Sequence, residues 1–146
     1  MCIRDRFLEP YGCPEGVLVP AAAPEAVETE TAFGWPLVRT LADLDIGQTL
    51  VVKDRAVVAV EGMEGTDETV RRAAALAGPG VVVLKAARTR QDPRVDLPMV
   101  GLETVRTLVE ARAAALVVEA GRVPFFQREE ARAAAAAGGV ALIGRR

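Results

Sequence analysis

The chain has 146 residues, of which 51% are hydrophobic and 26% charged, and its formal net charge is -2. This length and composition predict one soluble globular domain with a packed core. Acidic and basic residues are interspersed and only 4% of residues are aromatic. The sequence therefore lacks the basic, aromatic-rich face that a nucleic-acid-binding protein uses. No run of about eighteen apolar residues occurs, which leaves peripheral contact as the form of membrane association to consider.

The residue types that the chain lacks limit its chemistry. It contains no histidine, serine or asparagine, which excludes serine–histidine hydrolysis and histidine-ligated zinc. Carboxylates with arginine and lysine remain, and this is the set that Mg²⁺-dependent chemistry on phosphate uses. The two cysteines, Cys2 and Cys13, have no metal-ligand spacing and follow no signal peptide, so we expect a cytoplasmic protein without structural disulfides.

The N-terminal part has no apolar periodicity. Residues 1–6 also lack a turn pattern, and we interpret them as a non-native addition. Prolines and glycines punctuate residues 7–30, so we expect residues 1–30 to be a linker, poorly ordered or loosely packed, ahead of a folded domain at 31–146. Apolar residues spaced three or four apart predict a helix over 29–44, in which Pro36 is tolerable only near the first turn.

Two β-branched runs, 50–53 and 56–61, flank a tight Asp54-Arg55 turn and predict a β-hairpin. Gly65 and Thr66 then precede a helical pattern, with Thr66 as the expected N-cap. A helix N-terminus favours an anion, so these two residues are candidates to contact phosphate or ribose. The alternative, preferred on this segment alone, is that the first-turn acids Asp67 and Glu68 only offset the helix dipole.

The central feature is the apolar run 81–84, which stops at Lys85. A loop with Asp92, Arg94 and Asp96 follows, and its prolines stiffen the backbone that carries the two carboxylates. Loops of this kind suit a metal or phosphate site. Later segments predict a helix from 101, a strand at 115–119, a helix at 127–137 and a strand at 140–143.

This alternation predicts an α/β fold, a mostly parallel (mixed) sheet flanked by helices, with the hairpin at one edge. Three strands end in charge, at Glu61, Lys85 and Glu119, and in a parallel sheet these ends share an edge beside the loop. Carboxylates on a metal and cations on phosphate would make a phosphoanhydride hydrolase. The alternative, a solvated rim of charges that pair with each other, has about equal weight, and Lys53 and Lys85 can equally extend to solvent.

Six motifs, in order from about Ala32 to the C-terminus, resemble the C-terminal domain of the LpxI-type UDP-2,3-diacylglucosamine pyrophosphatases. They are LVVKD (50–54), AVEGMEGTD (59–67), VVLK (82–85), QDPRVDLPMVG (91–101), ETV (103–105) and VEAGR (118–122). The resemblance implies hydrolysis of UDP-2,3-diacylglucosamine to lipid X and UMP in lipid A biosynthesis. It also implies Mg²⁺ as cofactor and a place on the cytoplasmic side of the inner membrane of Gram-negative bacteria.

The resemblance puts the essential aspartate at Asp96, with Asp92 as second choice. The implied metal ligands are Asp96, Asp92 and Glu61, and the implied substrate-binding residues are Lys53, Gly65, Thr66, Asp67, Lys85, Gln91, Arg94, Glu119 and Gly121. Residues 7–18 resemble the connection out of the family's N-terminal domain, and without that domain the chain is expected to keep a site but lose its cleft. A non-catalytic nucleotide-sugar module is therefore the alternative function, and a homodimer stays open.

Overall fold

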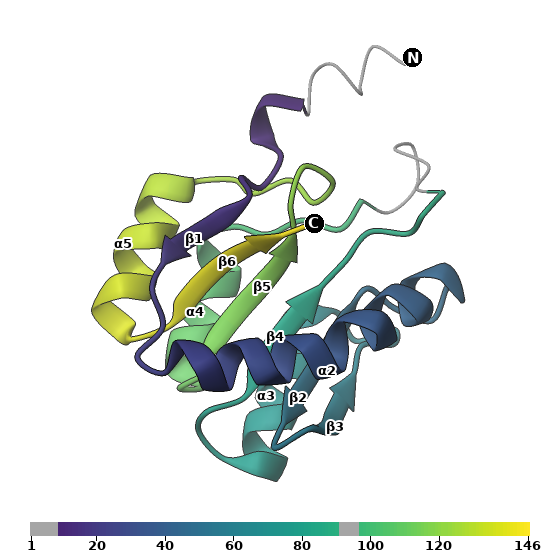
Figure 1. The fold of residues 1–146 in the computed structure, drawn as a ribbon, viewed down its shortest axis with the longest axis horizontal. Coiled ribbons are helices and arrows are strands. Elements are labelled where there is room, and N and C mark those ends of the chain that lie inside the picture. Colours follow the sequence, from purple (N-terminus) through teal and green to yellow (C-terminus); the bar gives the residue numbers. More distant parts are fainter. Residues whose placement is uncertain (1–8, 91–96) are drawn as a thin grey trace.

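A computed structural model describes residues 9–90 and 97–146, which form a six-stranded sheet with helices on both faces (Figure 1). The strands are β1 (Gly16–Val19), β2 (Thr49–Lys53), β3 (Ala56–Val60), β4 (Val82–Lys85), β5 (Ala115–Glu119) and β6 (Ala141–Arg145). The helices are the 3₁₀ turn η1 (Glu9–Tyr11), α2 (Pro24–Asp43), α3 (Thr66–Ala77), α4 (Leu102–Glu110) and α5 (Arg128–Gly138). None of the described helices is long and apolar enough to cross a membrane.

The strand order is β1-β6-β5-β4-β2-β3. Strands β4, β5 and β6 are parallel, while β2 runs antiparallel to both β4 and β3, and β1 runs antiparallel to β6. The hairpin β2–β3 turns through Asp54 and Arg55, both at φ 54°, and occupies one edge. The predicted mixed α/β sheet with a hairpin at its edge is confirmed, with β1 and β2 running against the other four strands.

The strands bury both faces, which explains their continuous apolar runs. Alternate residues of β4 point to opposite sides: Val82 and Leu84 pack under α2, while Val83 packs with α3, α4 and α5. In Figure 1, α2 crosses the front of the sheet and α3 and α4 lie behind it. Gly34 lets α2 approach closely, because a Cβ there would lie 2.3 Å from Leu84 Cδ1.

The prediction of a loosely packed linker is wrong for residues 9–30. Strand β1 pairs with β6, Cys13 and Val19 are buried, and α2 begins at Pro24. The segment before β1 approaches β6 so closely that a Cβ on Gly144 would lie 1.7 Å from the Pro14 carbonyl oxygen. A four-residue edge strand is too short to show periodicity, and its pairing depends on β6, which lies far along the chain. Residues 1–6 lie outside the described residues, so their interpretation stays a prediction.

The earlier start of α2 also corrects the expectation for Pro36. Pro24 occupies the first turn, where its missing N–H costs no helical bond, and Pro36 lies in the helix interior. The Thr40 hydroxyl donates to the Pro36 carbonyl, 2.9 Å away. Burial of Trp35 and Val38 beside the proline offsets the lost backbone bond, because packing can override local propensity.

Candidate functional site

The three charged strand ends lie on one edge of the sheet. Strands β3, β4 and β5 point the same way, and the register sets Lys85 opposite Thr49 on one side and beside Val118 on the other. Glu61, Lys85 and Glu119 therefore share the carboxyl edge, as predicted. The loop candidates Gln91, Asp92, Arg94 and Asp96 lie outside the described residues, so their place beside this edge stays a prediction.

A pocket of about 470 Å³ opens at this edge. It is lined by Asp45, Ile46, Gly47, Gln48, Glu61, Gly62, Gly65, Thr66, Lys85, Arg88, Leu97, Pro98 and Met99. Four residues expected from the sequence meet here: Glu61, Gly65, Thr66 and Lys85. The sequence did not single out Gln48 or Arg88. Gln48 reaches this edge only because β2 runs antiparallel to β4.

Lys85 is the buried cation of this pocket, with only 4% of the residue exposed. Its Nζ donates to Thr66 Oγ1 at 2.6 Å and to Thr49 Oγ1 at 3.2 Å. Thr66 was expected to cap α3, but Gly65 is the N-cap residue at φ 86° and no side chain caps the helix. The Thr66 hydroxyl instead accepts from Lys85, so a buried cation adjoins the electropositive start of a twelve-residue helix.

Glu61 supplies a carboxylate to the same pocket. Its Oε2 is buried and makes no hydrogen bond among the described residues. The backbone of Glu61 is fixed, because its N–H donates to the Thr49 carbonyl at 3.0 Å and its own carbonyl packs against Gly47. A buried carboxylate oxygen without a donor is exceptional in proteins, and it is available to a cation or a ligand hydroxyl.

The loop between β3 and α3 is held by Glu64. This carboxylate accepts from the Gly62 N–H at 3.0 Å, from the Thr69 hydroxyl at 3.2 Å and from Arg72 at 2.5 Å. Hydrogen bonds from its own backbone N–H, from Arg72 and from Gly62 lower the pKa of Glu64 to about 2. Asp67, expected to bind substrate, is half-buried in the first turn of α3 but does not line the pocket.

Glu119 is placed for a structural role. The residue is 3% exposed, and its Oε1 accepts from Arg39 Nη1 at 2.8 Å and Arg122 Nη1 at 3.4 Å. Its Oε2 accepts the backbone N–H of Ala87 at 2.9 Å. Both oxygens thus already have partners, which fits the alternative that strand-end charges form ion pairs, although the partners are arginines from α2 and the turn after β5.

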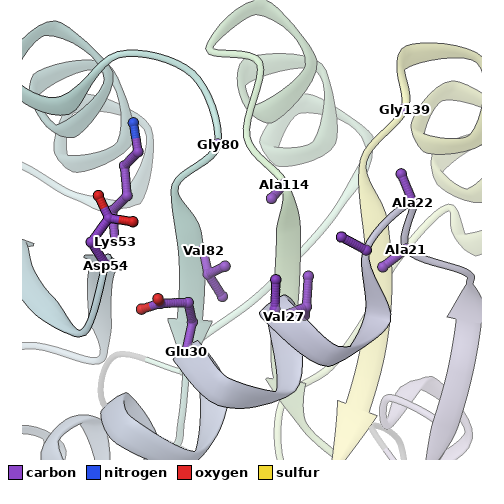
Figure 2. A pocket seen from close by; sticks show the side chains of 12 residues that line it. Ala21, Ala22, Val27, Glu30, Lys53, Asp54, Gly80, Val82, Ala114 and Gly139 are labelled. Atoms are coloured by element: carbon purple, nitrogen blue, oxygen red, sulfur yellow. The ribbon is translucent and has the colours of Figure 1, made fainter.

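Two further candidates lie away from the pocket. The Gly121 N–H donates to the Cys13 carbonyl at 2.8 Å, which ties the turn after β5 to the segment before β1. Lys53 lies at the opposite ends of the strands from Lys85, where its Nζ donates to the Ala77 carbonyl at 2.7 Å. It lines a separate pocket of about 220 Å³ with Glu30, Asp54, Val27, Val82 and small residues (Figure 2). The structure therefore does not bring Lys53 together with Lys85.

The donor set for a magnesium ion is incomplete in the described part of the chain. No group of three or more Asp, Glu, His or Cys residues among residues 9–90 and 97–146 could hold a metal. Magnesium keeps several waters and binds proteins through one or two carboxylates plus substrate phosphates. Glu61 Oε2 suits such a site as one ligand, and the second carboxylate of the pocket, Asp45, forms an ion pair with Arg88.

Comparison with known proteins identifies the family of this sequence. The model of the LpxI C-terminal domain matches residues 14–143. A UDP-2,3-diacylglucosamine pyrophosphatase, LpxI of Caulobacter vibrioides, is 40% identical over 114 residues, which cover 73% of this chain and 41% of that protein. The chain thus spans less than half the length of this relative. With nearly all of its sequence inside the matched range, the chain belongs to the LpxI C-terminal domain family.

Proposed function

We propose that this domain carries the hydrolytic residues of a UDP-2,3-diacylglucosamine pyrophosphatase, which forms lipid X and UMP in lipid A biosynthesis. The observation that carries the proposal is the buried Lys85 beside the N-terminus of α3, which no side chain caps, inside a pocket of about 470 Å³. Backbone N–H groups at a helix start bind phosphate oxygens, and a buried cation strengthens that attraction. Family membership and the name of the Caulobacter relative support the choice of UDP-2,3-diacylglucosamine as the proposed substrate.

In the proposed reaction, Lys85 and the first N–H groups of α3 bind the phosphate oxygens, and Arg88 supplies a second positive charge. A carboxylate, Asp96 or else Asp92, orients a water molecule and takes its proton as the oxygen attacks phosphorus. The bridging P–O bond breaks, so UMP and the sugar phosphate separate. Gln91 and Arg94 belong to the same proposed loop.

Mg²⁺ is the proposed cofactor, held by Glu61 together with Asp92 or Asp96. When bound, it would neutralise phosphate charge and lower the pKa of a coordinated water. Because the proposed substrate is a lipid nucleotide, we also propose a cytoplasmic enzyme that meets its substrate at the inner membrane surface of Gram-negative bacteria. A homodimer stays a prediction.

The second candidate is a nucleotide-sugar-binding module without turnover, and the observation that favours it is the 41% coverage of the relative. UMP release should be measured for this chain and for a chimera in which it replaces the matched part of the Caulobacter protein. Release by either protein supports hydrolysis. If neither releases UMP but UDP-diacylglucosamine raises the melting temperature, the binding module is the correct function.

Asp96→Asn tests the catalytic assignment in whichever of these proteins is active. Asparagine keeps the shape and removes the charge, so kcat should fall by about a hundredfold or more while KM changes little. Asp92→Asn is the matched variant in the same loop. Near wild-type turnover of Asp96→Asn would move the assignment to Asp92, and normal turnover of both would remove catalysis from this loop.

A further inference from the structure

We propose that Asp43, the last residue of α2, is a positioning residue that fixes residues 87–89 after β4 and, with them, Arg88 in the pocket. The proposal rests on the function proposed above, since its consequence is measured in turnover. Asp43 lies 46 residues before its partner Thr89 in sequence and was not a candidate from its pattern. Its role follows from what its two oxygens contact.

Asp43 holds Thr89 through both carboxylate oxygens. The Thr89 N–H donates to Oδ1 at 2.7 Å, and the Thr89 hydroxyl donates to Oδ2 at 2.8 Å. On the other side, Arg122 Nη2 donates to the Thr89 carbonyl at 3.0 Å. Thr89 is thus held by two separate elements, α2 and the turn after β5.

The neighbouring residues are fixed in the same way. The Ala87 N–H is bound by Glu119, and Arg88 forms an ion pair with Asp45, just after α2. Each residue of the stretch 87–89 therefore has a carboxylate partner from outside its own strand. Arg88 lines the 470 Å³ pocket, so this stretch sets the position of one pocket cation.

The location of Asp43 argues against a role in helix stability. The C-terminal end of a helix carries partial negative charge, so an aspartate there is unfavourable, and the last turn of α2 has no basic residue. The carboxylate also remains ionised to low pH, because the hydrogen bonds from Thr89 lower the pKa of Asp43. The contacts that offset the unfavourable position are those to Thr89.

Consequences for turnover follow from geometry. A segment fixed at three consecutive residues holds Arg88 with small positional spread, and displacement by about 1 Å of a group that faces the reacting phosphate can lower the rate by about a hundredfold. Loss of one of these contacts leaves the pocket, Lys85 and the helix N-terminus in place. Substrate affinity should therefore persist while the fraction of productive complexes falls.

The test compares Asp43→Ala with Asp43→Asn and with Glu110→Ala in the active protein identified above. Asparagine can accept from the Thr89 N–H and donate to its hydroxyl, so it keeps both contacts without the charge. Glu110 is the matched control, because it is the exposed last residue of α4 at the opposite edge of the sheet. The readouts are kcat, KM, the melting temperature and hydrogen exchange of the Thr89 amide.

We expect Asp43→Ala to lower kcat about tenfold or more, to leave KM within about twofold, to keep the melting temperature and to speed exchange at Thr89. Asp43→Asn should restore most of kcat, and Glu110→Ala should behave as wild type. Wild-type turnover of Asp43→Ala would overturn the proposal, as would equal losses in the alanine and asparagine variants. If neither wild-type protein releases UMP, the proposed function fails, and unchanged Thr89 exchange in Asp43→Ala would then overturn the positioning role separately.

Discussion

Glu119→Ala should destabilise the domain strongly, because Glu119 is the buried acceptor that joins β5 to α2 and to the segment after β4. The substitution removes the acceptors of Arg39, Arg122 and the Ala87 N–H together. Ala87 is 2% exposed, so its N–H cannot turn to water, whereas the arginine side chains are 36% and 35% exposed and can be hydrated. Most of the loss should therefore come from Ala87.

The magnitude follows from these exposures. A buried donor left without an acceptor costs about 1–3 kcal/mol. The two half-exposed ion pairs add about 1 kcal/mol after discounting for solvent, and the lost side-chain burial adds about 1 kcal/mol. The expected fall in unfolding free energy is about 3–5 kcal/mol, which with a urea m-value of about 2 kcal/mol/M lowers the midpoint by about 1.5–2.5 M.

Urea unfolding at neutral pH, followed by tryptophan fluorescence, measures this change. Trp35 is the one tryptophan in the sequence, and it is 7% exposed beneath Arg145, so its emission should report loss of the α2 packing. Glu129→Ala is the control, because that carboxylate is 88% exposed and 3.9 Å from Arg132. It should change stability by less than about 0.5 kcal/mol.

A loss below about 1 kcal/mol in Glu119→Ala would refute this reasoning. It would mean that Ala87 and the arginines find other partners, and that the buried carboxylate is dispensable for folding. The interpretation of Glu119 as a substrate-binding residue would then be favoured. In that case Glu119→Ala should lower the affinity for UDP-diacylglucosamine instead of the stability.

Two further predictions concern the rim of the pocket. Gly47→Ala should lower the unfolding free energy by about 1–3 kcal/mol in urea, because its Cβ would lie 1.9 Å from the Glu61 carbonyl oxygen; Gly101→Ala, with its nearest atom at 3.9 Å, should cost less. Because the pKa of Glu64 is lowered from 4.5 to about 2, its contribution to stability is complete above about pH 4.5 and is lost as the pH falls toward 2. Glu64→Gln should flatten the stability curve in that window, and an unchanged acid limb would contradict the assignment.

The shared edge of Glu61, Lys85 and Glu119 was predictable because strand direction follows from alternation. A strand, a helix and a second strand give a parallel pair, and charges that end such strands must collect at one edge. The hairpin was predictable from its turn, since Asp54 and Arg55 sit between two β-branched runs. These inferences need only local pattern and the usual handedness of the connections.

Strand β1 was not predictable in the same way. Its four residues include an exposed Gly16 and Val17, and the pairing partner β6 lies more than a hundred residues later. Many of the contacts that hold residues 9–23 are backbone bonds to other segments, such as the Cys13 N–H to the Val123 carbonyl at 3.0 Å. Backbone partners leave no mark on residue type, so prolines and glycines were the visible signal there.

The residues of the site also differ in whether the sequence could predict them. The sequence identified Lys85, Thr66 and Glu61 because each stands at a junction of elements. It could not show that Thr49 reaches Lys85 from an antiparallel strand, nor that Glu119 has partners for both oxygens. Those facts depend on strand order and on side-chain direction, which the alternation of apolar residues does not specify.

Three departures from local stability rules lie at the carboxyl edge. A lysine is buried against two hydroxyls, one oxygen of Glu61 lacks a donor among the described residues, and aspartates lie at the unfavourable end of α2. At the opposite edge, Lys53 reaches the C-terminal carbonyl of α3, where a cation is favourable. The three unfavourable placements at the carboxyl edge fit the proposal that this domain meets its ligand there, because sequences depart from local stability rules chiefly at functional sites.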